Sequence, residues 1–296
     1  MEKVLGVDIG GTKIRIGIIN NDGTILFDET VPTRVPLYPY LEKLVQQVLV
    51  EFPEVTAIGI GTHGFVEPKA GRIIYATDIL PGWTGTKVKE QLQKATGRRV
   101  EVENDANCAA LAEAKFGAAK GINRVVCLTL GTGLGGGIIW DGKLLSGGMH
   151  GGAAEIGHMI LYPNGVRCAC GRKGCLEQYI SGTALRRRIA AAGLAIAPEK
   201  LFLEAHSNES ARQVVDSFVE DLALAVSSLQ AVFDMDMLVI GGGVSESAEF
   251  WWQQFIEYLE PFLLNPLSVQ TAKFENDAGI LGAALLVMEE NAIEEQ

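Results

Sequence analysis

One histidine and three cysteines lie close together near the middle of the chain, and their side chains are typical metal ligands. They are His158, Cys168, Cys170 and Cys175. Three thiolates and one imidazole nitrogen make the closed, four-coordinate set that zinc takes in structural sites. Glycines between the cysteines permit the sharp turns that bring the sulfur atoms together. The spacing therefore predicts a structural zinc ion, with no coordination position left open for catalysis.

Two glutamates flank this predicted zinc site. Glu155 precedes the histidine by three residues, and Glu177 follows the last cysteine by two. We expect the zinc loop to fix the positions of both carboxylates. The other two cysteines, Cys108 and Cys127, lie in apolar surroundings and are predicted to be core residues. In a cytoplasmic protein this pattern favours metal binding over disulfide formation.

Two glycine-rich turns follow short apolar runs, and each has the residues to hold phosphate. The first is Asp8-Ile9-Gly10-Gly11-Thr12-Lys13, and the second begins with Gly131-Thr132-Gly133. Glycine lets backbone amides approach an anion without a Cβ clash, and Asp8 can hold a hydrated Mg²⁺. The alternative for the first turn is a hairpin with an incidental aspartate. Two such turns in equivalent positions favour the binding of different phosphates of one nucleotide.

A third glycine run, Gly241-Gly242-Gly243, follows a predicted strand and precedes a predicted helix. Such a turn can lie beneath the adenosine of a bound nucleotide. Taken alone, the motif is explained equally well as an ordinary turn between a strand and a helix.

Asp105 is the strongest candidate for a catalytic base. It stands in the segment Glu103-Asn104-Asp105-Ala106-Asn107, between a predicted strand and a predicted helix. A carboxylate at the end of a strand is suited to accept a hydroxyl proton during phosphoryl transfer. The alternative makes Asp105 the N-cap of the helix, which its position permits. The phosphate turns elsewhere in the chain favour the catalytic role.

Strand and helix patterns repeat along the chain and predict two related lobes. The order strand, glycine turn, strand occurs at the N-terminus and again from residue 125. Strands that alternate with helices imply an α/β protein. We expect lobes over residues 1–117 and 118–296, with the last helix packed back on the first lobe. The main predicted strands are 4–9, 14–18, 57–61, 100–102, 125–130, 135–140 and 237–240, and the predicted helices are 38–51, 86–96, 106–116, 182–192, 198–206, 209–233, 247–263 and 277–290.

Charge and hydropathy argue against several classes of function. The formal net charge of the 296 residues is −11, which disfavours a duplex-DNA binder because phosphate contacts need clustered cations. No apolar run approaches the roughly 20 residues that span a bilayer, and the N-terminus lacks the pattern of a signal peptide. We therefore expect a cytoplasmic protein that binds neither nucleic acid nor membrane.

Taken together, these motifs resemble those of the ROK sugar kinases, a branch of the hexokinase, actin and Hsp70-like ATPases. The resemblance covers nearly the whole chain. It rests on the first glycine turn, the Asn104-Asp105 pair, the Glu155-x-x-His158 run with the cysteines after it, and the two later glycine runs. It implies a two-lobed actin/hexokinase-like fold, a duplicated RNase H-like architecture with a zinc knot, and transfer of phosphate from ATP to a sugar.

The resemblance also implies roles for single residues. Asp105 activates a sugar hydroxyl, usually the 6-hydroxyl, and the glycine turns hold Mg²⁺-ATP. His158 binds zinc through one ring nitrogen and faces the sugar with its other side. A homodimer is expected. The residues expected to contact the sugar are Gly64, Thr77, Asn104, Asp105, Glu155, His158 and Glu177, and those expected to contact the nucleotide are Asp8, Gly10, Gly11, Thr12, Lys13, Gly131, Thr132, Gly133, Gly241, Gly242 and Gly243.

Two positions depart from the usual pattern of this family. The usual Pro-Gly is His63-Gly64 here, and the usual Pro-Asn is Thr77-Asp78. These stretches look closer to the N-acetylmannosamine kinase half of the animal sialic-acid enzyme. We therefore expect N-acetylmannosamine as the preferred substrate, with glucose as the alternative.

Two non-enzymatic kinds of protein in the same family are the alternatives to an enzyme. A sugar sensor would be expected to lack the base, the zinc ligands or a phosphate turn, and all three are present. A transcriptional repressor needs an N-terminal helix-turn-helix, for which a first strand that starts at Val4 leaves no room. The sequence therefore favours an enzyme.

Overall fold

The computed structural model describes residues 2–288, which form two compact units. Within these residues, unit 1 comprises residues 2–117, 144–154 and 276–288, and unit 2 comprises residues 118–143 and 155–275. Residues 144–154 were expected in the second lobe, but they pack with unit 1. The last two residues of the helix predicted over 277–290 lie outside the described part of the chain.

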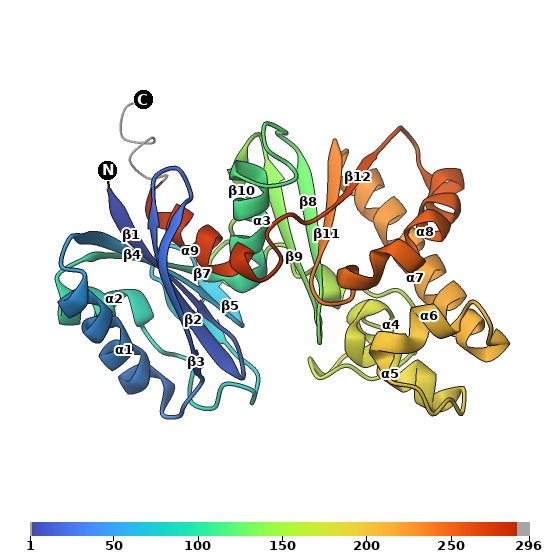
Figure 1. The fold of residues 1–296 in the computed structure, drawn as a ribbon, viewed down its shortest axis with the longest axis horizontal. Coiled ribbons are helices and arrows are strands. Elements are labelled where there is room, and N and C mark those ends of the chain that lie inside the picture. Colours follow the sequence, from blue (N-terminus) through green and yellow to red (C-terminus); the bar gives the residue numbers. More distant parts are fainter. Residues whose placement is uncertain (1, 289–296) are drawn as a thin grey trace. The chain divides into compact units, whose positions relative to one another are not determined.

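Unit 1 is built on a five-stranded mixed sheet with the order β3-β2-β1-β4-β7 (Figure 1). β1 is parallel to β4, and β4 is parallel to β7, whereas β2 and β3 are antiparallel to their neighbours. The carboxyl ends of the three parallel strands therefore meet at one edge of the sheet. The strands are β1 (Lys3–Ile9), β2 (Lys13–Asn20), β3 (Ile25–Pro32), β4 (Val55–Thr62) and β7 (Arg99–Asn104), with a small hairpin of β5 (Phe65–Glu67) and β6 (Arg72–Tyr75).

Four helices complete unit 1. They are α1 (Leu37–Glu51), α2 (Val88–Thr96), α3 (Asp105–Lys115) and α9 (Ala278–Met288). The C-terminal helix α9 packs against β1, β4 and α3. It approaches the sheet this closely because Gly6 and Gly59 lie beneath it, where a Cβ would collide with the carbonyl oxygens of Ile280 and Ala283.

Unit 2 repeats the strand order of unit 1. Its sheet has the order β10-β9-β8-β11-β12, with β8, β11 and β12 parallel (Figure 1). The α/β prediction with two related halves is confirmed by this repetition. The strands are β8 (Val125–Leu130), β9 (Leu134–Trp140), β10 (Lys143–Leu144), β11 (Met237–Gly241) and β12 (Ser268–Thr271).

The helices after β10 are mostly short, apart from one of 25 residues. The α-helices are α4 (Glu177–Ile180), α5 (Gly182–Ala191), α6 (Leu201–Glu204), α7 (Glu209–Phe233) and α8 (Trp252–Leu259), and the 3₁₀ turns are η1 (Ile156–His158), η2 (Pro198–Lys200), η3 (Ser245–Phe250), η4 (Glu260–Phe262) and η5 (Glu275–Asp277). None of the helices in the described chain has the length and apolar character needed to cross a membrane.

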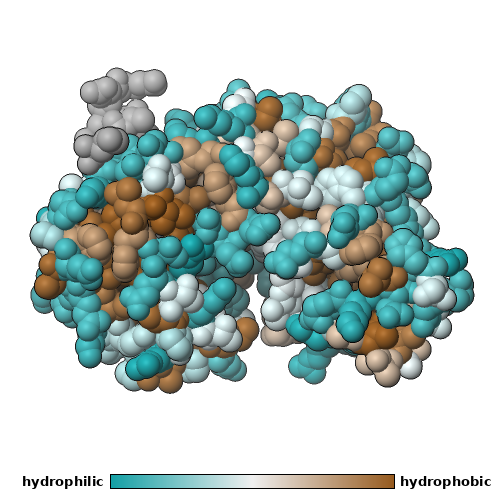
Figure 2. Space-filling view, viewed as in Figure 1, coloured by the Kyte–Doolittle hydropathy of each residue, from teal (hydrophilic) through white to brown (hydrophobic). Residues whose placement is uncertain are grey.

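The surface carries apolar side chains that are dispersed among polar ones. Figure 2 shows hydrophilic residues over much of the visible face, with hydrophobic residues between them. The most exposed large apolar side chains, Val50, Met149, Val232 and Leu264, belong to separate parts of the chain. Scattered exposure of this kind is normal in folded proteins.

Candidate active site

Three parallel strand ends position the candidate catalytic residues of unit 1. Asp8 on β1 pairs in register with Gly61 on β4, and Thr62 at the end of β4 pairs with Asn104 at the end of β7. The chain continues from β4 into His63 and from β7 into Asp105, the first residue of α3. The sheet thus brings the first carboxylate and the predicted base to the same edge.

Asn104, and not Asp105, is the N-cap of α3. The Oδ1 atom of Asn104 accepts hydrogen bonds from the backbone N–H groups of Ala106 (2.8 Å) and Asn107 (3.2 Å). Its Nδ2 group donates to the carbonyl oxygen of Gly64 at 3.1 Å. The Asp105 carboxylate also accepts a hydrogen bond from the backbone N–H of Ala106, at 2.9 Å. The cap function therefore does not account for Asp105, whose carboxylate retains capacity to accept a substrate proton.

The two carboxylates of this edge influence one another. Burial, more than any other cause, raises the pKa of Asp8 to about 7, and the charge of Asp105 adds to the rise while Lys13 and Arg15 oppose it. Burial also raises the pKa of Asp105, and the charge of His63 lowers it. Carboxylates with raised pKa values in one place are typical of catalytic sites and of cation sites.

The position of Asp8 depends on a glycine in α9. A Cβ added to Gly279 would lie 2.5 Å from Oδ2 and 2.6 Å from Cγ of Asp8. In the turn that follows β1, the backbone N–H of Gly10 donates to the carbonyl of Lys13 at 3.0 Å. The predicted phosphate turn therefore begins with a carboxylate whose place is set by the C-terminal helix. Sequence patterns did not identify Gly279, because its partner is more than 250 residues away.

The glycine turn that follows β8 contacts the start of α5 and the carboxylate of Glu177. The carbonyl of Gly131 accepts from the N–H of Gly182, at the start of α5, at 2.8 Å. The Glu177 carboxylate accepts from the N–H of Leu134 at 3.2 Å, and a Cβ on Gly133 would lie 2.5 Å from its Oε2. Glu177 was predicted to contact the sugar, and it lies directly beside this turn.

The third glycine run continues from β11. Gly242 has a φ of +86°, and a Cβ there would lie 2.7 Å from the backbone of Leu130 at the end of β8. The N–H of Val244 donates to that same residue's carbonyl at 2.9 Å. Gly243 faces open space. The run is thus held against the turn after β8, with one glycine exposed.

The four predicted zinc ligands come together in unit 2. Their ligand atoms all lie within 4.8 Å of one another. Cys170 Sγ is 3.6 Å from Cys175 Sγ, and Cys168 Sγ is 3.8 Å from His158 Nδ1. Zn–S bonds of about 2.3 Å in a tetrahedron place sulfur atoms about 3.8 Å apart, so the group fits zinc. Burial lowers the pKa of His158 and favours the neutral imidazole that a metal needs.

Glu155 lies beside one of the four predicted zinc ligands, His158. Its Oε2 atom lies 4.0 Å from Nε2 of His158, the ring nitrogen on the other side from the cysteines. An acidic partner for the second nitrogen of a metal-bound histidine fixes the orientation of the ring.

A polar network that sequence reasoning missed anchors the zinc loop. The hydroxyl of Tyr162 donates to Oδ1 of Asp221 at 2.6 Å, and Arg188 forms an ion pair with the same carboxylate. Tyr162 also packs edge-on against Tyr179, whose hydroxyl accepts from the N–H of Val166 at 2.9 Å. The sequence signal that could have identified this network is Asp221, an acidic residue within the apolar stripe of α7. In the structure Asp221 is only 3% exposed.

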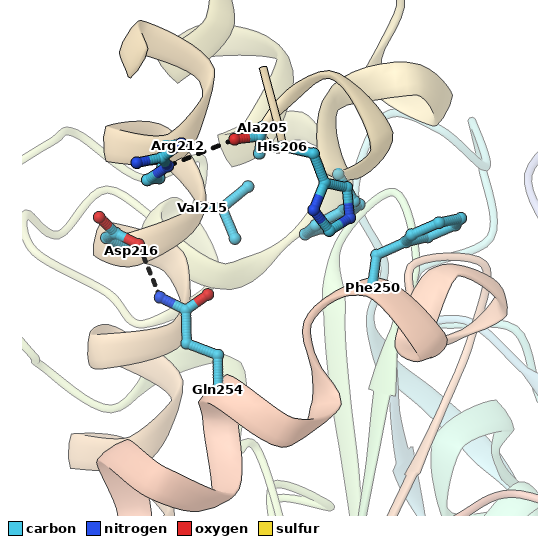
Figure 3. A pocket seen from close by; sticks show the side chains of 8 residues that line it. Ala205, His206, Arg212, Val215, Asp216, Phe250 and Gln254 are labelled. Atoms are coloured by element: carbon cyan, nitrogen blue, oxygen red, sulfur yellow. Dashed lines mark hydrogen bonds between the residues drawn. The ribbon is translucent and has the colours of Figure 1, made fainter. Parts of the chain in front are cut away.

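A separate cavity of about 340 Å³ lies among the helices of unit 2 (Figure 3). Arg212 donates to the carbonyl of Ala205 at 3.4 Å, and Gln254 donates to Asp216 at 2.6 Å across it. The rings of His206 and Phe250 lie 6.2 Å apart at another side. None of the residues predicted to bind sugar, nucleotide or zinc lines this cavity.

Comparison with known proteins shows close relatives over the whole length. The family model described as "ROK family" matches residues 4–290. The chain is 35% identical to a glucokinase from Thermotoga maritima, over 97% of this chain and 98% of that protein. It is also 35% identical to an N-acetyl-D-glucosamine kinase from Haemophilus influenzae, over 96% and 98% of the two chains.

Solved structures are similar over the same length. A ROK family glucokinase from Streptomyces griseus, in complex with glucose and AMPPNP, has a TM-score of 0.80 and 33% identity, with 96% of this chain and 98% of that chain covered. A putative N-acetylmannosamine kinase from Listeria monocytogenes has a TM-score of 0.87 and 30% identity, with 98% and 99% covered. The chain belongs to the ROK family.

Proposed function

We propose that this protein is a sugar kinase that transfers the γ-phosphoryl group of ATP to the 6-hydroxyl of a hexose or N-acetylhexosamine. The observation that carries the proposal is the Asp105 carboxylate, which lies at the same strand edge as Asp8 and the first glycine turn without serving as the helix cap. The use of ATP is supported by the AMPPNP bound to a relative.

In this proposal Asp105 is the general base. Its carboxylate accepts the proton of the attacking hydroxyl as the oxygen bonds to the γ-phosphorus, and the bond from that phosphorus to the bridging oxygen of ADP breaks. Asn104 and Gly64 are joined by a hydrogen bond beside this carboxylate and hold ring hydroxyls. Thr77 contributes a hydroxyl from the neighbouring loop. The attacking oxygen is thereby held in line with the γ-phosphorus and the oxygen that leaves with ADP, while its proton faces Asp105.

Asp8 and the turn that follows it are proposed to bind Mg²⁺-ATP. Gly10, Gly11, Thr12 and Lys13 supply amides and one cationic side chain. Mg²⁺, when bound, neutralises charge on the transferring phosphoryl group. A buried carboxylate whose pKa is raised to about 7 fits this role, because a neighbouring cation favours its ionised form.

Unit 2 contributes further proposed contacts. We assign Glu155, His158 and Glu177 to sugar hydroxyls, since all three lie on the zinc loop or directly beside it. A zinc ion held by His158, Cys168, Cys170 and Cys175 would have no open position and would fix these groups. The proposed nucleotide contacts are Gly131, Thr132, Gly133, Gly241, Gly242 and Gly243. A homodimer and a cytoplasmic location remain part of the proposal.

Gly279→Ala is expected to lower kcat/KM by at least about tenfold without loss of folding. The added methyl group displaces the Asp8 carboxylate, and a misplacement of about 1 Å can cost 10²-fold in rate. The measurement is steady-state kinetics over a range of Mg²⁺ and ATP concentrations. Gly148→Ala is the matched control, because a Cβ at Gly148 meets open space and the residue is not among the proposed contacts. Equal kinetics for both variants would remove Asp8 from the mechanism.

For the acceptor we propose N-acetylmannosamine, with glucose as the second candidate. His63-Gly64 and Thr77-Asp78 replace two prolines of the usual pattern at the loop that flanks Asn104. A less restricted loop with a threonine hydroxyl suits an acetamido group. Relatives named as glucokinase and as N-acetyl-D-glucosamine kinase support both sugar classes.

The test is the ratio of kcat/KM for N-acetylmannosamine, N-acetylglucosamine and glucose at one concentration of Mg²⁺-ATP. We expect N-acetylmannosamine to exceed glucose. If glucose exceeds it by tenfold or more, about 1.4 kcal/mol, the acetamido assignment is wrong. Failure of every sugar to accept phosphate would refute the kinase proposal itself.

A further inference from the structure

His63 has a backbone that is fixed from three sides. Its N–H donates to the carbonyl of Ile9, at the end of β1, at 3.2 Å. The preceding residue, Thr62, is fully buried and accepts a hydrogen bond from Trp83 Nε1 at 3.0 Å. The following residue, Gly64, accepts from Asn104 at 3.1 Å. The side chain of His63 therefore leaves the strand edge from a defined point.

The imidazole of His63 connects two parts of the proposed sugar site. Its Nε2 atom is hydrogen-bonded to Oγ1 of Thr77 at 3.0 Å. The ring is close enough to Asp105 that its charge lowers the pKa of that carboxyl group. Neither ring nitrogen has another hydrogen-bond partner in the described chain, so the contact with Thr77 is the one that fixes the ring.

We propose that His63 is a positioning residue for the acceptor sugar: it fixes the direction of the Thr77 hydroxyl in the proposed sugar site and so determines which ring substituent the site selects. The inference rests on the proposed kinase function. A threonine hydroxyl has one proton to donate and two acceptor positions. A hydrogen bond to a fixed imidazole occupies one of these, so the remaining ones face the substrate in a set direction.

Fixed polar groups discriminate strongly between substrates. A site built to hydrogen-bond one substituent rejects an analogue that leaves its polar group unpaired. A ring hydroxyl and an acetamido group present different donors and acceptors at the same position. The His63–Thr77 pair is therefore suited to distinguish hexoses from N-acetylhexosamines.

A purely structural role for this hydrogen bond is the alternative. The loop that carries Thr77 has other attachments, however: Trp83 bonds to Thr62, Thr84 Oγ1 accepts from the N–H of Ala76 at 3.0 Å, and the N–H of Leu80 donates to the Thr77 carbonyl at 3.0 Å. Loss of the imidazole leaves these bonds in place. The loop should then stay folded while the threonine hydroxyl becomes free to rotate.

The experiment compares His63→Ala, His63→Gln, Thr77→Val and the double variant His63→Ala/Thr77→Val. Each is assayed for the KM of N-acetylmannosamine and glucose, the KM of ATP, kcat and the melting temperature. We expect His63→Ala to raise the KM of the preferred sugar by about 3- to 10-fold, the range of one hydrogen bond, and to change the selectivity ratio. The KM of ATP and the melting temperature should stay close to wild type.

The His63→Gln variant and the double variant distinguish a positioning role of His63 from a general loss of structure. Glutamine can still reach Thr77, so His63→Gln should recover a substantial part of the lost selectivity. The double variant should be no worse than Thr77→Val alone, because both changes remove the same interaction. His206→Ala, a histidine substitution in unit 2, is the control and should leave selectivity unchanged.

Three results would overturn the inference. One is a His63→Ala enzyme with wild-type sugar KM and selectivity. Another is a double variant whose loss equals the sum of the single losses, and the third is a change confined to the melting temperature. A wild-type protein that phosphorylates no sugar refutes the kinase proposal and the inference with it, whereas an active wild type with unaffected variants refutes the inference alone.

Discussion

Asp105→Asn is expected to lower kcat by about 10²- to 10⁴-fold, which is the usual contribution of general-base catalysis. The amide has nearly the same shape as the carboxylate but cannot accept the hydroxyl proton. Asn104 caps α3, so the helix keeps its N-terminal hydrogen bonds in the variant. Sugar binding should therefore stay within a few-fold of wild type. Steady-state kinetics together with calorimetric titration of the sugar measures the two effects separately.

The pH dependence of the wild-type enzyme supplies a second test of the same residue. Burial raises the pKa of Asp105 above its ordinary value, and the base works only when it is ionised. Activity should therefore fall as the pH drops through this raised pKa, and Asp105→Asn should remove the part of the acidic limb that Asp105 contributes, while the part that comes from Asp8 remains. Asp141→Asn is the control, because Asp141 lies in a turn with a φ of +50° that asparagine tolerates. A near wild-type rate for Asp105→Asn would exclude the residue as the base.

Much of the framework was predictable because glycine turns and apolar runs are local signals. β1, β8, β11 and α7 lie close to the ranges expected from periodicity, and the helix expected over residues 86–96 ends as α2 at Gly97, a left-handed C-cap. The helix predicted over residues 247–263 is instead divided into η3, α8 and η4. The break near residue 260 coincides with Pro261, which cannot donate a backbone hydrogen bond to a continuing helix.

The supporting contacts of the site were not predictable from local patterns. Gly279 limits the space for Asp8, Asp221 anchors Tyr162, and His63 bonds to Thr77. The first two pairs join residues that are distant in sequence, and the pairing of His63 with Thr77 follows from no periodic pattern although both positions stand out in the sequence. The chemistry-bearing side chains stand in recognisable motifs, whereas the residues that hold them depend on the packed fold.

The second large loss of activity is expected when one of the four predicted zinc ligands is substituted. Purified protein should contain about one zinc ion per chain, and Cys170→Ala should lose it. Metal-binding free energy contributes to folding wherever the ligands are not preformed. The loop that bears Glu155 and His158 should then lose its fixed geometry, and kcat/KM should fall by about 10²-fold or more, because catalytic groups tolerate little displacement. Elemental analysis, melting temperature and kinetics on the same preparations measure these effects.

A matched cysteine substitution shows whether the loss comes from the metal. Cys127 is buried in β8, away from the four zinc ligands, and its thiol is not among them. Cys127→Ala should keep the zinc ion and lose only the stability that a small core truncation costs. Because the Tyr162–Asp221 hydrogen bond holds the far side of the zinc loop independently, Cys170→Ala should disturb the loop locally and leave the rest of unit 2 folded. Active wild-type protein without zinc, or a Cys170→Ala variant that retains it, would refute the assignment of these four residues as a zinc site.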